Sequence, residues 1–264
     1  MISDLAYVSP EAKLGENVTV HPFAHIDKNV VIGDNYEIMP YASIVGGTRI
    51  GNNVKVCQGS IIGADPQDFR WKGDETYCYI GNNVTIREHV IINRGIWKDR
   101  GTKVGDDSFV MAKSHIGHDT VIDGKSVIGN GVQISGNVHI EECTILSSNV
   151  LVYDGSNIGK WSMVKGGCRI NGNVPPYVII AHNPVAYYGV NAYILRNKGF
   201  AEKTIDEIAK AYRHIYQCGT TLYNALKRIK MDIEQSPERD EIVNFVEGHD
   251  MHLVAVQTHS EYID

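Results

Sequence analysis

An aliphatic residue occupies almost every sixth position between Val8 and Ile170, and this spacing constrains the fold more than any other feature. Of the 28 positions in this register, 25 hold Val, Ile or Leu, and the exceptions are Asp68, Asp74 and Lys98. An α-helix repeats every 3.6 residues and a long strand every two, so neither produces this register. A coil of short strands that turns a corner every six residues does produce it.

A second register lies two residues before the first and holds small or β-branched residues such as Ala12 and Ser60. Side chains two apart in a strand point to the same side, so both registers face an interior. Gly15, Gly33 and Gly51 recur every 18 residues, so three hexads make one turn of a triangular coil. We expect these glycines to adopt the positive φ of tight corners. The pattern predicts a left-handed parallel β-helix of about nine coils, stacked at roughly 4.8 Å, followed by a C-terminal α-helical domain.

The six-residue register also indicates how the chain is divided. The predicted parts are a β-helix domain (1–185), loops inserted into it (64–79 and 96–102) and a C-terminal helical domain (186–264). Both insertions leave the register in phase afterwards, so they leave the coil as loops, and loops on a rigid scaffold commonly carry function. The register stops at Pro175-Pro176, because proline cannot donate to an internal ladder.

Beyond residue 185 the apolar spacing becomes helical. Thr204-Ile205-Asp206-Glu207 has the pattern of a capping box, which predicts a helix start there, and Gly219 ends that helix. A second helix is predicted from Leu222 to Ile233, and a third begins at Ser236-Pro237. We expect the helices to cover the open end of the coil.

Composition narrows the class of protein. The net charge is −6, which does not suggest a nucleic-acid partner, and the charges are mixed along the chain. The N-terminus shows no signal-peptide pattern, and no apolar run approaches the ~20 residues of a membrane span. Five cysteines without CxxC spacing favour reduced thiols. We therefore expect a cytoplasmic protein without a membrane span.

The stretch from His115 to Asp119 carries the strongest catalytic signal. Ile116 belongs to the inward register, so His115 and His118 point outward, with Gly117 leaving space between them. Histidine transfers protons near neutral pH, and Asp119 is placed to orient the imidazole of His118. The alternative is a pair of solvated surface histidines.

Small and polar residues stack above this pair along the coil. Gly136 and Asn137 follow one coil later, and Asp154 two coils later, which leaves room for a substrate above His118. Zinc bound by His115-x-x-His118 is another interpretation, with His89 or His139 as the third ligand. His139 belongs to a different face of the coil, so we expect no metal.

Two further clusters are candidate binding sites. Asn191, Arg196, Asn197 and Lys198 crowd a short helical stretch, and amide and cationic donors of this kind suit a diphosphate. A solvated helix face explains them equally well. The other cluster is the polar stretch Gln67-Asp68-Phe69-Arg70 in the first predicted loop.

The chain resembles one family over essentially its whole length, the acyl-ACP:UDP-N-acetylglucosamine O-acyltransferases of lipid A biosynthesis. The resemblance is carried by Ile62-Gly63, Pro66-Gln67-Asp68, Lys72–Thr76, Ile86-Arg87-Glu88, Asn93-Arg94-Gly95, His115–Asp119, Val174–Val178, Tyr188–Asn191 and Ala211–Tyr216. It implies a 3-hydroxyacyl chain moving from acyl carrier protein to the 3-hydroxyl of UDP-N-acetylglucosamine. It also implies a homotrimer with each site between two chains, and no cofactor, since the thioester supplies the activation.

The same resemblance implies roles for individual residues. His118 would be the general base, Asp119 would orient it, and the Gly136 N–H would stabilise the oxyanion. Gly166 matches the position that limits acyl-chain depth. The residues implied in substrate binding are Gln67, Asp68, His115, Asn137, Tyr153, Asp154, Asn191 and Lys198.

The chain departs from the family pattern around the implied nucleotide-sugar pocket. The family commonly has His at Asn137, His-Gln at Tyr153-Asp154, Glu at Tyr193 and Arg at Asn197. Three alternative functions share the repeat: another hexapeptide-repeat acyltransferase acting on an amine or using CoA, a zinc lyase of the carbonic-anhydrase kind, and a non-enzymatic scaffold.

Overall fold

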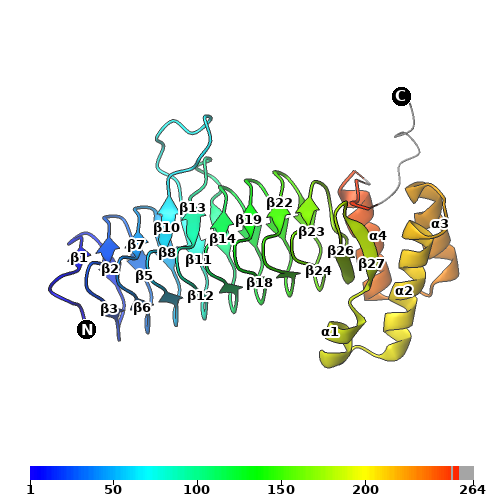
Figure 1. The fold of residues 1–264 in the computed structure, drawn as a ribbon, viewed down its shortest axis with the longest axis horizontal. Coiled ribbons are helices and arrows are strands. Elements are labelled where there is room, and N and C mark those ends of the chain that lie inside the picture. The colour runs from blue at the N-terminus through cyan, green and yellow to red at the C-terminus, as the bar shows by residue number, and fades with distance from the viewer. Residues whose placement is uncertain (251, 256–264) are drawn as a thin grey trace.

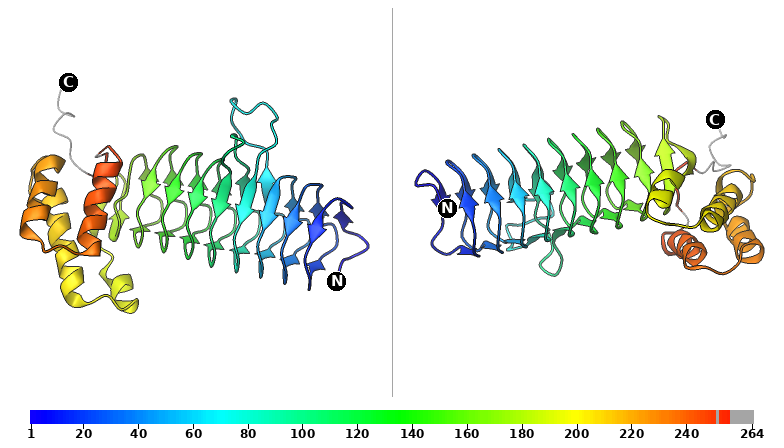
Figure 2. Two further views of the ribbon diagram at one scale, coloured as in Figure 1. Left: turned by 180° about the vertical axis from the view of Figure 1, so that it is seen from behind. Right: turned by 90° about the horizontal axis from the view of Figure 1, so that it is seen from below.

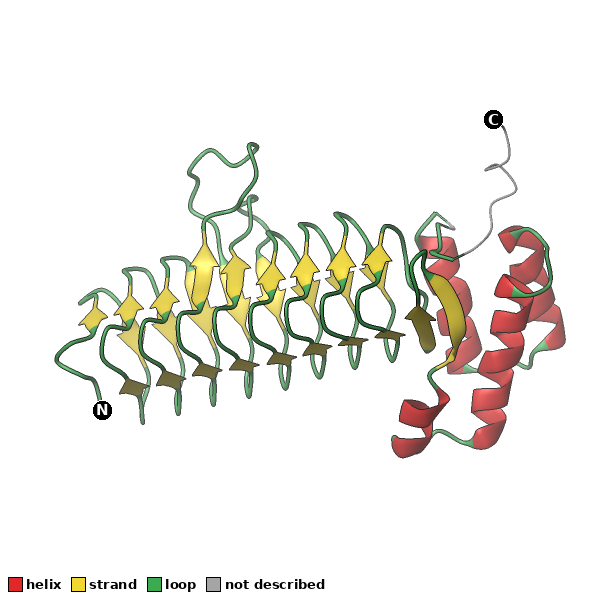
Figure 3. Cartoon of the chain, in the orientation of Figure 1, coloured by secondary structure: helices red, strands yellow, loops and turns green. Residues whose placement is uncertain are grey.

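The chain folds into a long three-sided coil of short strands, followed by a group of helices at its C-terminal end (Figure 1). The structure is a computed structural model that describes residues 1–250 and 252–255. Its sheets have nine, eight and ten strands, which we call sheets I, II and III. Successive strands pass from sheet I to II to III and back to I, and the parallel topology fits the predicted β-helix (Figure 3).

The strand bounds follow the register. Sheet I contains β1 (Tyr7–Val8), β4 (His25–Ile26), β7 (Ser43–Ile44), β10 (Ile61–Ala64), β13 (Ile91–Asn93), β16 (His115–Ile116), β19 (Gln133–Ile134), β22 (Leu151–Val152) and β25 (Arg169–Ile170). Sheet II contains β2 (Lys13–Leu14), β5 (Val31–Ile32), β8 (Thr48–Ile50), β11 (Cys78–Ile80), β14 (Thr102–Val104), β17 (Val121–Ile122), β20 (His139–Ile140) and β23 (Asn157–Ile158). Sheet III contains β3 (Thr19–Val20), β6 (Glu37–Ile38), β9 (Lys55–Val56), β12 (Thr85–Ile86), β15 (Phe109–Val110), β18 (Val127–Ile128), β21 (Ile145–Leu146), β24 (Met163–Val164), β26 (Val178–Ala181) and β27 (Ala186–Val190).

The aliphatic register fills the bore of the coil. Ile116 pairs in register with Ile92 on one side and Ile134 on the other, and all three side chains are fully buried. Burying such a side chain contributes about 1.5–3 kcal/mol. Equivalent apolar side chains of successive turns therefore stack on one another inside the coil. The outward positions of successive turns are aligned in the same way.

The corners differ from the prediction in one respect. Positive φ belongs to Asn17 (54°) and Asn35 (55°), not to the preceding glycines Gly15 and Gly33, which lie outside the left-handed region. Those glycines are needed for space, because a Cβ on Gly15 would lie 2.5 Å from the carbonyl carbon of Gly33 in the next coil. Asparagine tolerates the left-handed conformation, and the Asn17 side chain donates to that of Asn35.

Two loops leave the coil beside each other (Figures 1 and 2). The first loop (residues 65–77) connects β10 to β11, and the second loop (residues 94–101) connects β13 to β14. Both lie at the corner where a sheet I strand passes to sheet II, which we call the I–II corner. Both predicted insertions are therefore present and lie on the same corner of the coil.

The coil does not stop at the two prolines as expected. β26 follows them and pairs in parallel with β24, and β27 pairs antiparallel with β26. Residues 252–254 close the sheet II edge: Leu253 bridges Asn173, which is hydrogen-bonded to the backbone on both sides. The end of the β-helix is thus covered by its own continuation.

The described residues that follow the coil form four helices (Figures 1 and 3). Their bounds are α1 (Ala192–Asn197), α2 (Glu202–Tyr216), α3 (Leu222–Asp232) and α4 (Pro237–Gly248). The predicted starts of the last two are confirmed at Leu222 and Ser236-Pro237. Thr221 accepts from the Asn224 N–H, which was not predicted, and Ser236 accepts from the Arg239 N–H. The predicted capping box is wrong: α2 begins at Glu202 after an extended Ala201, so Thr204 lies inside the helix.

The helices pack against the last strands. The Tyr212 hydroxyl in α2 is fully buried and donates to the carbonyl oxygen of Pro176 at 2.5 Å. Tyr216 stacks on Tyr187 of β27 with ring centroids 4.4 Å apart. Among the described residues no helix is long and apolar enough to cross a membrane.

Candidate active site

His118 and Asp119 form a hydrogen-bonded pair at the I–II corner, in the turn between β16 and β17. Nδ1 of His118 lies 2.9 Å from Oδ2 of Asp119, and each residue is only 7% exposed. Asp119 occupies the left-handed position of this corner, with a φ of 55°, where Asp and Asn are better tolerated than most residues. The fold of the corner therefore fixes the carboxylate next to the imidazole.

The Asp119 carboxylate is also held from the second loop. The backbone N–H of Ile96 donates to Oδ2 at 2.9 Å, so this oxygen faces two nitrogen donors. Oδ1 is buried and has no hydrogen-bond partner among the described residues. A carboxylate held in this way orients the imidazole with its N–H on Nδ1 and leaves Nε2 able to accept a proton.

Gly136 lies under the imidazole, one coil along. A Cβ on Gly136 would lie 3.0 Å from Cδ2 of His118 and closer still to Cε1 and Nε2. Gly117 is also needed for space, because a Cβ added to it would lie 2.8 Å from the Gly136 nitrogen in the next turn. The Gly136 N–H donates to no other group in residues 1–250 and 252–255. A free backbone donor thus lies beside the imidazole, as an oxyanion site requires.

Asp68 of the first loop reaches Nε2 of His118. Its Oδ2 lies 3.4 Å from Nε2, and the Arg70 guanidinium and backbone N–H both donate to its carboxylate. The hydrogen bonds from Arg70 hold the pKa of this carboxyl well below its usual range. Gln67 is exposed beside it. The first loop therefore brings a fixed negative charge to the proton-accepting side of His118.

His115 borders the same corner and is half-buried. Its Nε2 lies 2.7 Å from Oδ1 of Asn93, whose Nδ2 donates to the Asp65 carbonyl. Burial, and secondarily the charge of His118, lowers the pKa of His115. The Asn93 oxygen can only accept, so the N–H of His115 lies on Nε2. Sequence reasoning on residue types did not single out Asn93 or the Ile96 N–H, and it named Arg70 only as part of the polar stretch Gln67–Arg70.

The polar edge continues along the coil above His118. The Asn137 N–H donates to the His118 carbonyl at 2.9 Å, and the Asn137 side chain donates to Oδ1 of Asp154 at 3.0 Å. Tyr153 is 48% exposed beside them. The predicted stacking of these residues over the His118–Asp119 pair is therefore present.

Three predicted site residues lie away from this corner. Gly166 is in the turn from β24 to β25, which is a corner between sheets III and I. Lys198 is exposed at the end of α1. Asn191 is 2% exposed, and its Nδ2 donates to the Trp161 carbonyl at 2.9 Å. Because the Asn191 amide is buried and already bonded, it holds α1 to the coil and is not free to bind a diphosphate, and Arg196 is paired with Glu202.

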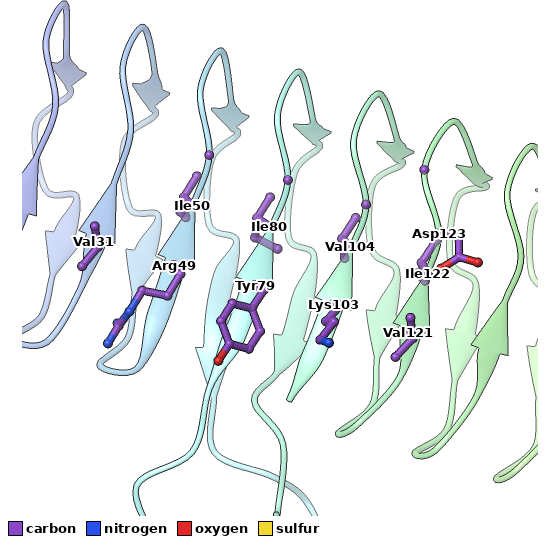
Figure 4. A pocket seen from close by; sticks show the side chains of 14 residues that line it. Val31, Arg49, Ile50, Tyr79, Ile80, Lys103, Val104, Val121, Ile122 and Asp123 are labelled. Atoms are coloured by element: carbon purple, nitrogen blue, oxygen red, sulfur yellow. The ribbon is translucent and has the colours of Figure 1, made fainter. Parts of the chain in front are cut away.

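Other candidate groups do not join the site. His139 of β20 lies in sheet II and pairs with Asp123 at 3.1 Å. In residues 1–250 and 252–255 no cluster of three or more His, Cys, Asp or Glu has metal-binding geometry. A shallow groove of about 460 Å³ lies on the outside of sheet II, where Arg49, Tyr79 and Lys103 project from neighbouring strands (Figure 4). It contains none of the residues around His118.

Comparison with known proteins gives one consistent result. The family described as "Udp N-acetylglucosamine O-acyltransferase; Domain 2" matches residues 173–253, and the GMPPB C-terminal domain family matches residues 2–99. The chain is 39% identical to an acyl-[acyl-carrier-protein]–UDP-N-acetylglucosamine O-acyltransferase of Ectopseudomonas mendocina, over 90% of this chain and 92% of that protein. A relative of the same description from Pseudomonas aeruginosa is 37% identical over 94% of this chain and 98% of its own length.

Solved structures agree with the sequence comparison. The fold is similar to LpxA, a UDP-N-acetylglucosamine acyltransferase from Bacteroides fragilis, with a TM-score of 0.93 and 42% identity over 98% of this chain and all of that one. LpxA from Acinetobacter baumannii is similar with a TM-score of 0.92 and 32% identity, over 96% and 99% of the two chains.

Proposed function

The chain belongs to the acyl-[acyl-carrier-protein]–UDP-N-acetylglucosamine O-acyltransferases, and we propose that the corner around His118 is where it transfers a 3-hydroxyacyl chain from acyl carrier protein to the 3-hydroxyl of UDP-N-acetylglucosamine. This reaction would be the first step of lipid A biosynthesis. One observation carries the assignment of the site: the Asp119 carboxylate binds Nδ1 of His118, so that Nε2 faces the side where Asp68 and Gly136 lie.

The proton transfers follow from this arrangement. The sugar hydroxyl gives its proton to Nε2 of His118 while its oxygen bonds to the thioester carbonyl carbon. The resulting imidazolium is stabilised by Asp119, and the oxyanion accepts the free N–H of Gly136. When the carbon–sulfur bond breaks, the imidazolium returns the proton to the departing thiolate. Every atom and charge is then accounted for by the two substrates.

The acceptor sugar would bind along the polar edge of the I–II corner. Asp68, with its low pKa, is an acceptor for a sugar hydroxyl next to Nε2, and Gln67 is exposed beside it. His115, with its lowered pKa, borders the same space. Asn137, Tyr153 and Asp154 extend the edge and would contact the nucleotide part.

The remaining parts of the site would come from a neighbouring chain. Within one chain, Gly166 and His118 lie on different corners of the β-helix. Gly166 would therefore limit the acyl chain held at the His118 of another copy. This favours a homotrimer with each site between two chains. Lys198, exposed at the end of α1, would reach the diphosphate of such a site.

We propose that the chain consists of a β-helix domain (1–185) and a helical domain (186–264), and that β27 connects them. Residues 251 and 256–264 of the second part lie outside the described residues. The proposed number of coils stays at about nine, and the nine strands of sheet I among the described residues support it. The five unpaired cysteines suit a cytoplasmic enzyme.

The test compares His118→Ala with a matched control. The wild-type protein, given 3-hydroxyacyl-ACP and UDP-N-acetylglucosamine, is expected to form the 3-O-acyl product, and His118→Ala to lose roughly 10²–10⁴-fold in kcat. His139→Ala removes another histidine paired with an aspartate, but in sheet II, and should keep the wild-type rate. A His118→Ala variant as active as His139→Ala would contradict the assignment.

A further inference from the structure

The second loop contributes a backbone donor to the catalytic pair. The Ile96 N–H donates to Asp119 Oδ2 at 2.9 Å, and the same oxygen is 2.9 Å from Nδ1 of His118. Ile96 itself is only 4% exposed, so this hydrogen bond is protected from water. Two donors to one oxygen hold the carboxylate more firmly beside the imidazole than the imidazole alone would.

Gly95 brings the loop close enough for this contact. A Cβ on Gly95 would lie 2.6 Å from Oδ1 of Asp119 and 2.9 Å from the Cα of Gly101. Its φ lies outside the left-handed region, so glycine is required here for space and not for backbone conformation. Any side chain at position 95 must push either the loop or the carboxylate away from its place.

Arg94 anchors the same turn to the first loop. Its backbone N–H donates to the Ala64 carbonyl, and its Nη1 donates to the Gly46 carbonyl, each at 2.9 Å. Its guanidinium also pairs with Asp65 and lies 5.1 Å from the centre of the Trp71 ring. The first loop carries Asp68, which faces Nε2 of His118, and the Ile96 N–H binds Asp119, which faces Nδ1. The turn at residues 94–96 therefore connects the two carboxylates on either side of the imidazole.

We propose that residues 94–96 are a positioning element for the His118–Asp119 pair. The Ile96 N–H sets the orientation of the Asp119 carboxylate, Gly95 permits the approach, and Arg94 fixes the turn against the first loop. Through the carboxylate, the element holds the His118 N–H on Nδ1 and Nε2 free to accept a proton. The catalytic part of this inference rests on the proposed function, because it takes the pair to be the base of the acyl transfer.

A double-mutant cycle tests whether the element acts through Asp119. Gly95→Ala is expected to lower kcat roughly 10-fold or more with KM for both substrates little changed, because it displaces the carboxylate and with it the imidazole. In an Asp119→Ala background the same change should cost clearly less than in the wild type, because the colliding Oδ1 is gone and only the approach to Gly101 remains. The close approach to Gly101 is present in both backgrounds and cancels. Equal losses in the two backgrounds, or a wild-type kcat in Gly95→Ala, would overturn the proposal.

A second pair of variants isolates the backbone donor. Ile96→Pro removes the N–H and much of the side chain, whereas Ile96→Ala removes side-chain atoms and keeps the N–H. We expect a lower kcat in Ile96→Pro than in Ile96→Ala. Equal kcat values in the two variants would show that the donor does not matter.

A spectroscopic measurement separates failure of this inference from failure of the proposed function. The ¹⁵N shifts of labelled histidine, assigned with His118→Ala, report which ring nitrogen of His118 carries the proton. Gly95→Ala is expected to increase the population protonated on Nε2, and Ile96→Ala to leave it as in the wild type. If the wild-type protein transfers no acyl group but the shifts move as expected, the function fails and the positioning stands. Unchanged shifts in Gly95→Ala would overturn the positioning even in an active enzyme.

Discussion

Gly136→Ala changes one hydrogen atom to a methyl group directly under the catalytic imidazole. The added carbon would lie 3.0 Å from Cδ2 of His118 and nearer to Cε1 and Nε2, whereas ordinary carbon contacts begin at 3.4 Å. The Gly136 backbone cannot retreat, because its carbonyl accepts from Gly155 and the next residue, Asn137, donates to the His118 carbonyl. The imidazole must therefore move, by on the order of 1 Å.

A displacement of that size separates Nε2 from the attacking hydroxyl and stretches the 2.9 Å contact with Asp119. Misplacing a catalytic group by about 1 Å costs about 10²-fold in rate, so we expect kcat to fall by roughly that factor. The overall fold should survive, because the clash is at the surface of the coil and not in its bore.

The assay is the initial rate of 3-O-acyl product formation with saturating substrates, together with a thermal melt of each variant. Gly248→Ala is the matched control, because a Cβ at the end of α4 meets no atom of residues 1–250 and 252–255 within 4 Å. A folded Gly136→Ala protein with a rate within threefold of that control would refute the argument that the imidazole rests on this glycine.

Three further outcomes follow from contacts described above. Arg70→Gln removes the main cause of the low pKa of Asp68, so the Asp68 carboxyl should titrate at a higher pH in ¹³C NMR. The stabilisation that ionised Asp68 provides above its ordinary pKa, and that is lost as pH falls through the depressed value, should shrink; an unchanged titration would contradict this. Gly166→Met should shift the preferred donor to a shorter acyl chain in a length series, and an unchanged optimum would remove it as the depth limit. Tyr212→Phe leaves the buried Pro176 carbonyl without its donor and should cost about 1–3 kcal/mol in urea denaturation, so a smaller loss would show that water replaces the hydroxyl.

Much of the coil was predictable because its signal is local and repeated. Each inward position, such as Ile116, is fixed by hydrogen bonds to the coils above and below, so counting by six finds the bore and the two loops. Corner conformation was harder, because Gly15 and Asn17 both suit turns and only the structure shows which has positive φ. The misplaced start of α2 has a similar cause: Thr204 and Glu207 have the right spacing, but the chain becomes helical at Glu202.

The catalytic pair was predictable because adjacent outward residues must meet at a corner, whereas its supports were not. The Ile96 N–H is a backbone group and has no sequence signature. The contact of Asp68 with His118 depends on the path of the first loop, which Arg94 helps to fix through Asp65 and Trp71. Asn191 was misjudged because its burial depends on packing of α1 against the coil, which the polarity of the residue does not reveal.

The left-handed corner position that Asp119 occupies recurs at Asn137 in the next coil, which has a φ of 54°. The I–II corner therefore offers equivalent backbone positions along the axis of the β-helix, one in each turn. A His-Asp pair moved to positions 136 and 137 would lie one turn of the β-helix nearer the helices, while the depth limit proposed at Gly166 stayed in place. The length of the accepted acyl chain could therefore change in evolution when the His-Asp pair moves along the β-helix and position 166 stays the same. Position 154 would then need a glycine, as position 136 does next to His118.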